Sequence, residues 1–88
     1  MAKKIDMTQR KYDLLVATVC ANIRKIRKQR GYTQEKLGEI SGLGRIRIVE
    51  IEGSRYAPTL ATLNTLAIAL GVEVYLLLMP KIDDELTK

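Results

Sequence analysis

The stretch "GLGRIRIVEIEG", from Gly42 to Gly53, decides the fold because it can be read as a strand or as a helix. It is rich in β-branched residues, and Ile46, Arg47 and Ile48 alternate as they do in strands. As a strand, however, both faces would mix charge with apolar bulk, so neither would make a clean core. As a helix, the stretch groups Ile48, Ile51 and Glu52 on a core side with Gly44. The displayed side carries Arg45, Ile46, Val49 and Glu50, with Arg47 at the boundary. We therefore predict a helix, since β propensity depends strongly on context.

Hydrophobic spacing predicts three more helices around this stretch. The first runs from about Thr8 to Arg30, the second from Gln34 to Ser41 behind an N-cap at Thr33, and the last ends at Leu70 behind a cap at Thr59. Their apolar stripes are, in order, Tyr12, Val16, Val19, Ile23 and Ile26; Leu37 and Ile40; and Leu60, Leu63, Leu66, Ala67 and Leu70. Two short helices joined at Gly42 make a helix-turn-helix.

The length and composition of the chain limit the classes of protein to which it can belong. The chain has 88 residues, one cysteine and no histidine, so it makes one small domain without an internal disulfide. We expect Cys20 to be a small buried residue, and we expect no metal, no cofactor and no enzymatic activity, because no nucleophile–base pair or ligand cluster is evident. The longest apolar run is too short to span a membrane, and the predicted location is the cytoplasm, at the nucleoid.

Charge is placed unevenly along the chain. Residues 1–55 hold 13 Lys/Arg against 6 Asp/Glu, whereas residues 56–88 hold 2 against 4. A basic front half favours a polyanionic partner, although a solvated basic face is the alternative interpretation.

The ordered motifs resemble those of the Cro/repressor-type (XRE-like) helix-turn-helix family. They are "IRKIRKQRGYTQEKLGEISGLGRIRIVEIEG" from Ile23 and "PTLATLNTLAIALGV" from Pro58. The resemblance covers about residues 20–72, and it implies a compact helical domain that places its second motif helix in the major groove of double-stranded DNA.

The resemblance also assigns candidate contacts, and the chemistry of the side chains fits them. The base contacts are Arg45, Ile46, Arg47, Val49 and Glu50; the phosphate contacts are Thr33, Gln34, Gly44, Ser54, Arg55 and Tyr56. Arginine forks onto guanine, glutamate accepts from cytosine and apolar side chains pack on thymine methyl groups. The alternatives are a protein contact for Ile46 and Val49, an ion pair with a neighbouring arginine for Glu50, and a solvated loop charge for Arg55.

Three positions matter for the scaffold of the motif. In similar proteins an arginine of the first helix pairs with a glutamate that ends the recognition helix, and Arg27 and Glu52 match those positions. Gly38 stands where alanine is usual, and Gly44 stands where a polar capping residue is usual. The following loop reads Glu52-Gly53-Ser54 in place of Glu-Asn-Gly.

The segment "VEVYLLLMP" after Gly71 predicts a strand. Its backbone groups need a partner, and we expect the same strand of a second copy, which makes a homodimer. The alternative is a last segment that packs back on the core of its own chain. The interface residues are then Val72, Val74, Tyr75, Leu76, Leu77 and Leu78. The strand is similar to that of HipB-type antitoxins, which adds a toxin protein as a candidate partner.

The whole chain thus divides into a flexible N-terminus (1–9), a helix-turn-helix domain (10–72), a dimerisation strand (73–80) and a mobile tail (81–88). The predicted fold is an all-α bundle of four or five helices plus one C-terminal β-strand. The predicted function is a homodimeric DNA-binding repressor acting on an inverted repeat, with an antitoxin as one form of it. The alternative is a protein-interaction module that has the fold but does not read DNA.

Overall fold

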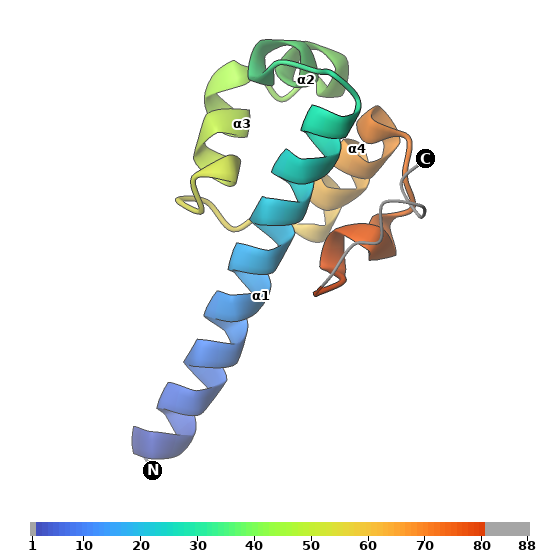
Figure 1. Ribbon diagram of the computed structural model, residues 1–88. Helices are drawn as coiled ribbons and strands as arrows, with labels where there is room; N and C mark the ends of the chain where they lie inside the picture. The colour runs from blue at the N-terminus through green and yellow to red at the C-terminus, as the bar shows by residue number, and fades with distance from the viewer. Residues whose placement is uncertain (1, 81–88) are drawn as a thin grey trace.

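The computed structural model describes residues 2–80, with side chains from residue 7 onward, and all regular secondary structure within this range is helical. The elements are α1 (Ala2–Gln29), α2 (Gln34–Ser41), α3 (Arg45–Glu52), α4 (Leu60–Leu70) and the 3-10 helix η1 (Val74–Leu78). The C-terminal half of α1 packs with the other elements, while its N-terminal half projects away from them (Figure 1). The mobile tail predicted for 81–88 lies outside the described residues.

The opening stretch is a helix, as predicted. Gly42 ends α2 in the left-handed conformation, with φ 75°, and its N–H donates to Glu39 O. Ile48 and Ile51 of α3 are both fully buried, so a helical period of burial overrides the β-branched composition of this stretch.

One hydrophobic core joins the helices. It is built from Val19, Cys20, Ile23, Ile26, Leu37, Ile48, Ile51, Leu63, Leu66, Ala67, Leu70 and Leu77. The predicted N-caps are confirmed, since Thr33 accepts from Lys36 N at 2.9 Å and Thr59 accepts from Thr62 N at 3.1 Å. Each cap satisfies a backbone donor that the first turn of a helix leaves open. These caps fix where α2 and α4 begin.

Three residues expected on apolar stripes are exposed: Leu60 by 77%, Tyr12 by 52% and Ile40 by 42%. Leu60 is the first residue of α4, and the buried stripe of that helix begins one turn later, at Leu63.

The first helix is longer than predicted. It begins at Ala2 rather than near Thr8, so residues 2–9 are helical and not a flexible end. This stretch contains no glycine or proline and consists largely of good helix formers. Gln9 Nε2 also donates to Asp13 Oδ1 at 2.9 Å across one turn.

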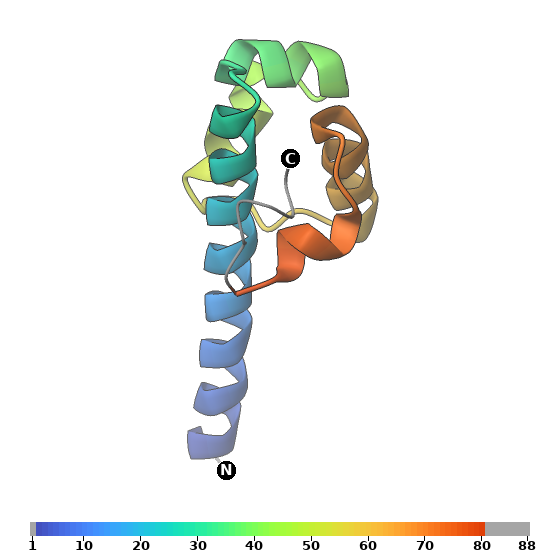
Figure 2. The ribbon, with the colours of Figure 1, turned by 45° about the vertical axis from the view of Figure 1, so that its right-hand side comes forward.

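The predicted C-terminal strand is wrong. Residues 74–78 form η1, which turns back against α1 and α4 within the same chain (Figure 2). Leu76 and Leu77 are consecutive and both buried, which alternation in a strand does not allow when only one face is covered. Of the other predicted interface residues, Val72 and Val74 pack against the core, whereas Tyr75 and Leu78 are exposed. The intermolecular sheet predicted from this strand therefore has no support.

The buried side chain of Asn22 explains how the backbone of this segment is satisfied. Its Nδ2 donates to Leu77 O at 3.0 Å and to Met79 O at 2.8 Å. Sequence reasoning missed this contact, although an asparagine among the core positions of α1 was its signal. The Asn22 amide thus donates hydrogen bonds to backbone carbonyl groups of this segment, as the backbone of a neighbouring strand would.

We expect Asn22→Ala to lower the free energy of unfolding by about 1–3 kcal/mol, because two buried carbonyl groups lose their donor. Urea denaturation followed by circular dichroism measures this. The control is Asn64→Ala on the exposed side of α4, with an expected effect within about 0.5 kcal/mol. Equal stability of the two variants would contradict the anchoring role of Asn22.

Candidate nucleic-acid interface

The outer face of α3 is the centre of the candidate interface. Ile46 is 73% exposed, Val49 is 38% exposed, and Arg45 is also exposed. Arg47 and Glu50 are partly buried at the flanks of this face. Since Ile48 and Ile51 occupy the core side, every predicted base contact lies on the part of α3 that the fold leaves outside or at its edge. A short helix held from behind in this way can enter a groove without rearranging.

Arg47 is held in place by Tyr56. Its Nη1 donates to the Tyr56 hydroxyl at 2.9 Å, and its Cζ lies 4.5 Å from the centre of the Tyr56 ring. A guanidinium over an aromatic ring gains cation–π attraction. Two candidate residues from different parts of the interface are thereby brought together, and the side chain of Arg47 is already ordered.

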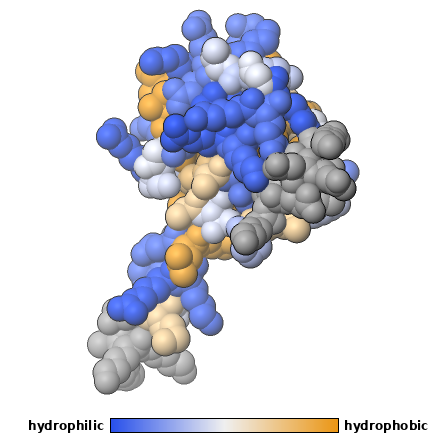
Figure 3. Space-filling view, viewed as in Figure 1, coloured by the Kyte–Doolittle hydropathy of each residue, from blue (hydrophilic) through white to orange (hydrophobic). Residues whose placement is uncertain are grey.

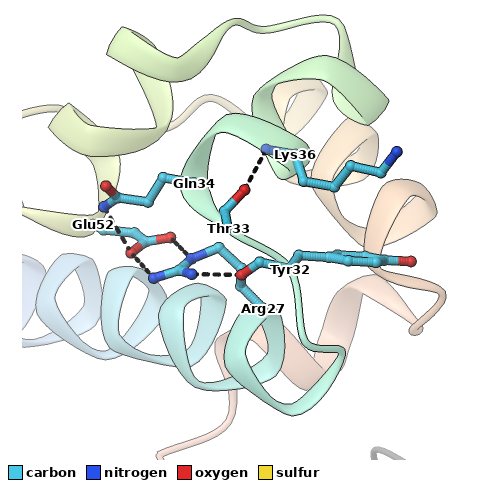
Figure 4. Close-up of polar contacts among 6 residues, drawn as sticks. All are labelled: Arg27, Tyr32, Thr33, Gln34, Lys36 and Glu52. Atoms are coloured by element: carbon cyan, nitrogen blue, oxygen red, sulfur yellow. Dashed lines mark hydrogen bonds and ion pairs between the residues drawn. The ribbon is translucent and has the colours of Figure 1, made fainter.

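An ion pair fixes α3 to α1. Arg27 Nε lies 2.6 Å from Glu52 Oε2, and Arg27 Nη2 donates to Glu52 Oε1 at 2.9 Å (Figure 4). The remaining nitrogen, Nη1, donates to Tyr32 O at 2.7 Å. The two side chains are only 9% and 3% exposed. Every nitrogen of this buried guanidinium therefore has an acceptor, which is the condition for tolerating the charge.

The N-terminus of α2 meets the same carboxylate. Gln34 Nε2 donates to Glu52 Oε1 at 3.2 Å (Figure 4), so the amide of this candidate phosphate contact points inward to the ion pair. Thr33 is exposed, and the backbone N–H groups of the first turn of α2 still form the kind of site that binds phosphate. One glutamate thus connects α1, α2 and α3.

The turn between α2 and α3 is unusually tight. A Cβ added to Gly38 would lie 2.6 Å from Arg45 N and 2.6 Å from Gly44 C, and Gly44 N donates to Gly38 O at 3.0 Å. Gly44 itself has φ 88° and ψ 153°, a combination that is essentially restricted to glycine. The two departures from the family pattern therefore belong together, because both let the start of α3 approach α2 closely.

The loop after α3 carries the remaining candidates. Ser54 has φ 58° and is the non-glycine residue with positive φ among the described residues; it stands where the family usually has glycine. Ser54 and Arg55 are exposed.

Burial raises the pKa of the nearby Cys20 thiol, and a hydrogen bond with Ser54 opposes this shift. The thiol is therefore protonated at neutral pH and unsuited to act as a nucleophile.

The described residues contain no group of three or more histidine, cysteine, aspartate or glutamate side chains placed to hold a metal ion. In the same part of the chain, no helix has the length and apolar character needed to cross a membrane.

Comparison with known proteins agrees with this geometry. A family model described as Helix-turn-helix matches residues 23–77. The chain belongs to the Cro/repressor-type (XRE-like) helix-turn-helix family. The matched range runs from the C-terminal half of α1 through η1, so it includes the tight turn, α3 and the Arg27–Glu52 pair of this helix-turn-helix protein.

Two relatives bear on the role of this helix-turn-helix protein. It is 46% identical over 57 residues to the immunity repressor protein of Bacillus phage phi105, a match that covers 65% of this chain and 40% of the phage protein. It is 36% identical over 66 residues to a hypothetical transcription factor of Neisseria meningitidis, covering 75% of this chain and 62% of that protein. The chain thus spans less than two thirds of either relative.

The crystal structure of the hypothetical transcription factor NHTF from Neisseria has the same fold as this helix-turn-helix protein. The TM-score is 0.72 at 36% identity, and the match covers 75% of this chain and 76% of that chain. Over the matched part, the arrangement of the helices is therefore also seen in a solved structure.

Proposed function

We propose that this protein is a sequence-specific DNA-binding transcriptional regulator that reads the major groove with α3. The observation that carries the proposal is the two-sided nature of α3. Its inner side is fixed by Ile48, Ile51 and the buried Glu52, while its outer side presents Arg45, with Ile46 at 73% exposure. A relative named immunity repressor and another named transcription factor support the same reading.

In this proposal, the basic residues and the N-terminus of α2 supply the affinity for DNA phosphates. Phosphates meet the first turn of α2 at Thr33 and Gln34 and the loop residues Ser54 and Arg55. The start of α3 at Gly44 lies between these two groups in the sequence. The excess of basic residues in positions 1–55 attracts the polyanion before specific contacts form.

Base reading depends on the side chains of the outer face. Arg45 and the ordered Arg47 bind guanine O6 and N7, Glu50 accepts from cytosine, and Ile46 and Val49 pack on thymine methyl groups. The exposed side chain of Ile46 contributes nothing to solubility. Contact with thymine methyl groups in the major groove would remove its apolar surface from water.

The finer proposals concern assembly and role. We propose a homodimer that acts as a repressor on an inverted repeat, because two half-sites about one helical turn apart match two copies of α3. Its place of action is the DNA of the cytoplasm. The antitoxin interpretation depended on the C-terminal strand, which is a 3-10 helix, so the proposal includes no toxin partner.

One observation favours a second candidate, a protein-interaction module. Ile46 and Val49 form an apolar spot on the outer face of α3, and a partner protein would cover such a spot as well as thymine methyl groups would. The two candidates differ in their response to salt, since phosphate contacts release counterions and weaken as salt rises.

Selection of random duplexes by the purified protein, followed by sequencing, tests the proposal. We expect an enriched inverted repeat, and we expect Arg45→Ala to weaken binding to it by roughly 5- to 150-fold and to relax the preference at one position of each half-site. The matched control is Arg10→Ala, which removes one exposed positive charge from the projecting part of α1 and should lower affinity by no more than about threefold. No enriched sequence, or equal losses in the two variants, would contradict base reading by α3.

A further inference from the structure

We infer that a second copy of this chain docks on an apolar surface between the projecting half of α1 and the start of α4. We call it the α1–α4 surface and define it by Tyr12, Leu15, Pro58, Leu60 and Leu78, which line one open groove. The inference deepens the proposed function, because it gives the regulator the pairing that an inverted repeat requires.

The surface arises because the apolar stripe of α1 continues beyond the core that its own chain provides. Val19 and Ile23 are buried by the other helices, but Tyr12 lies two turns earlier on the same side of α1. It is 52% exposed, and Leu15 is 46% exposed. Apolar surface is also visible where α1 leaves the rest of the domain (Figure 3). The stripe therefore ends in solvent rather than at a polar boundary.

The α4 side of the groove completes the surface. Leu60 is 77% exposed at the start of α4, and Leu78 at the end of η1 is 37% exposed. With about 200 Å² for a fully exposed large side chain, the exposed fractions of these four large residues amount to roughly 400 Å² of apolar area. Two copies facing each other would bury about 800 Å², which is close to the apolar share of an interface of standard size.

The charge distribution favours a second copy over an acidic partner. The chain has a net charge of +5, so two copies repel unless they meet through uncharged surface. Among the residues that the structure describes, no charged side chain lines the groove. In a two-fold arrangement this surface meets itself, and an apolar patch without charge is complementary to its own copy.

A rival surface on α4 is less suited to pairing. Ile68 is 73% exposed, but the hollow beside it is also lined by Arg30 and Glu73. Pairing there would desolvate charged groups on both copies. Ile68 is therefore a useful comparison position, because it is as exposed as Leu60 and lies on the same helix.

The position of the surface also suits DNA binding. Pro58 lies in the loop between α3 and α4, and Leu60 begins α4. The described residues that line the groove include none of α3, so a copy docked there leaves the outer face of α3 uncovered. Both recognition helices then remain free to contact the same duplex.

Sedimentation velocity on the purified full chain, without DNA, tests the inference over a range of about 1–200 μM protein. We expect a concentration-dependent dimer, and we expect Leu60→Glu and Leu15→Glu each to raise its dissociation constant by at least about 30-fold. Two matched controls place the same charge elsewhere: Ile68→Glu on α4, and Leu14→Glu at a 68% exposed position of α1. Each control should change the constant by less than about threefold.

The outcomes separate this inference from the proposed function. Arg45→Ala should lose DNA affinity yet sediment as the wild type does, and a dimer that binds no DNA sequence would overturn the function while leaving the docking surface intact. Circular dichroism verifies that each variant is folded; if either glutamate variant is not, Leu60→Ala and Leu15→Ala replace them with the same direction of effect. A wild-type monomer throughout the concentration range, or dissociation by Ile68→Glu in place of Leu60→Glu, would overturn the inference.

Discussion

Replacing Glu52 with glutamine will lower the free energy of unfolding by about 3–5 kcal/mol, because the buried Arg27 then has no countercharge. Glutamine preserves the size of the side chain, so the loss reports the charge and not a cavity. The Arg27 guanidinium would still donate to Tyr32 O, but two of its three nitrogens would face a neutral amide. For a domain of this size, the loss is a large fraction of a total stability of roughly 5–15 kcal/mol. Urea denaturation at constant pH measures the effect.

The control for this variant is Glu39→Gln. Glu39 lies 3.8 Å from Lys36 on the surface, with its side chain 73% exposed, and exposed pairs of this kind contribute about 0–1 kcal/mol. A double variant, Arg27→Met with Glu52→Leu, removes both charges and should recover much of the stability lost by the single change. If Glu52→Gln denatures at the same urea concentration as Glu39→Gln, the central role of the ion pair is wrong.

Replacing Gly38 with alanine will destabilise the protein by about 1–3 kcal/mol, although alanine is the better helix former by about 1 kcal/mol. The added methyl group would lie 2.6 Å from backbone atoms of Gly44 and Arg45. Because backbone atoms cannot rotate away as a side chain can, the start of α3 must shift. We therefore expect DNA affinity to fall as well, even under conditions in which the variant is fully folded.

Gly31→Ala separates the steric effect from a conformational one. Gly31 has φ 75° with no atom within 4 Å of an added Cβ, so this variant should lose only about 1 kcal/mol to the left-handed backbone. It should retain wild-type DNA affinity when folded, because a Cβ added at Gly31 touches no other group and so displaces neither α2 nor α3. Unfolding curves and binding isotherms for both glycine variants provide the comparison. A Gly38→Ala protein with unchanged stability would contradict the close approach of α2 and α3.

Local sequence signals were sufficient for the helices of the motif. Thr33 and Thr59 mark helix starts through their hydroxyl groups, and Gly42 marks a helix end through its positive φ. The helical period of Ile48 and Ile51 outweighed their β propensity because both residues must reach one core. These features depend on neighbours three or four positions away, which sequence periodicity reports directly.

The misjudged segments depend on contacts that are distant in the sequence. Residues 74–78 were predicted to form a strand. Their own pattern does not show that Asn22, 55 residues before Leu77, donates a hydrogen bond to the Leu77 carbonyl group. The extra turns of α1 were missed because the first residues lack an apolar stripe, although they have good helix propensity. Leu60 was assigned to the core because its spacing fits, but no element within residues 2–80 buries its side chain, which is 77% exposed.

In the candidate site, too, local sequence signals were predictive and contacts between long side chains were not. The family pattern placed the positions of α3 that face outward, because exposure follows from which residues fill the core. The contact between Arg47 and Tyr56 and the inward turn of Gln34 were not predictable, since both depend on the rotamers of long side chains. The roles of Arg47, Tyr56 and Gln34 in DNA binding are predictions.

The division of α3 into a fixed inner side and a free outer side has a consequence for how this protein can evolve. Arg45, Ile46 and Val49 make no contact on which the core depends, whereas Ile48, Ile51 and Glu52 carry the attachment of the helix. Under the proposed function, substitutions on the outer side therefore change the preferred DNA sequence at little cost in folding stability. A lineage of such proteins can drift from one binding site to another in single steps while every intermediate remains folded.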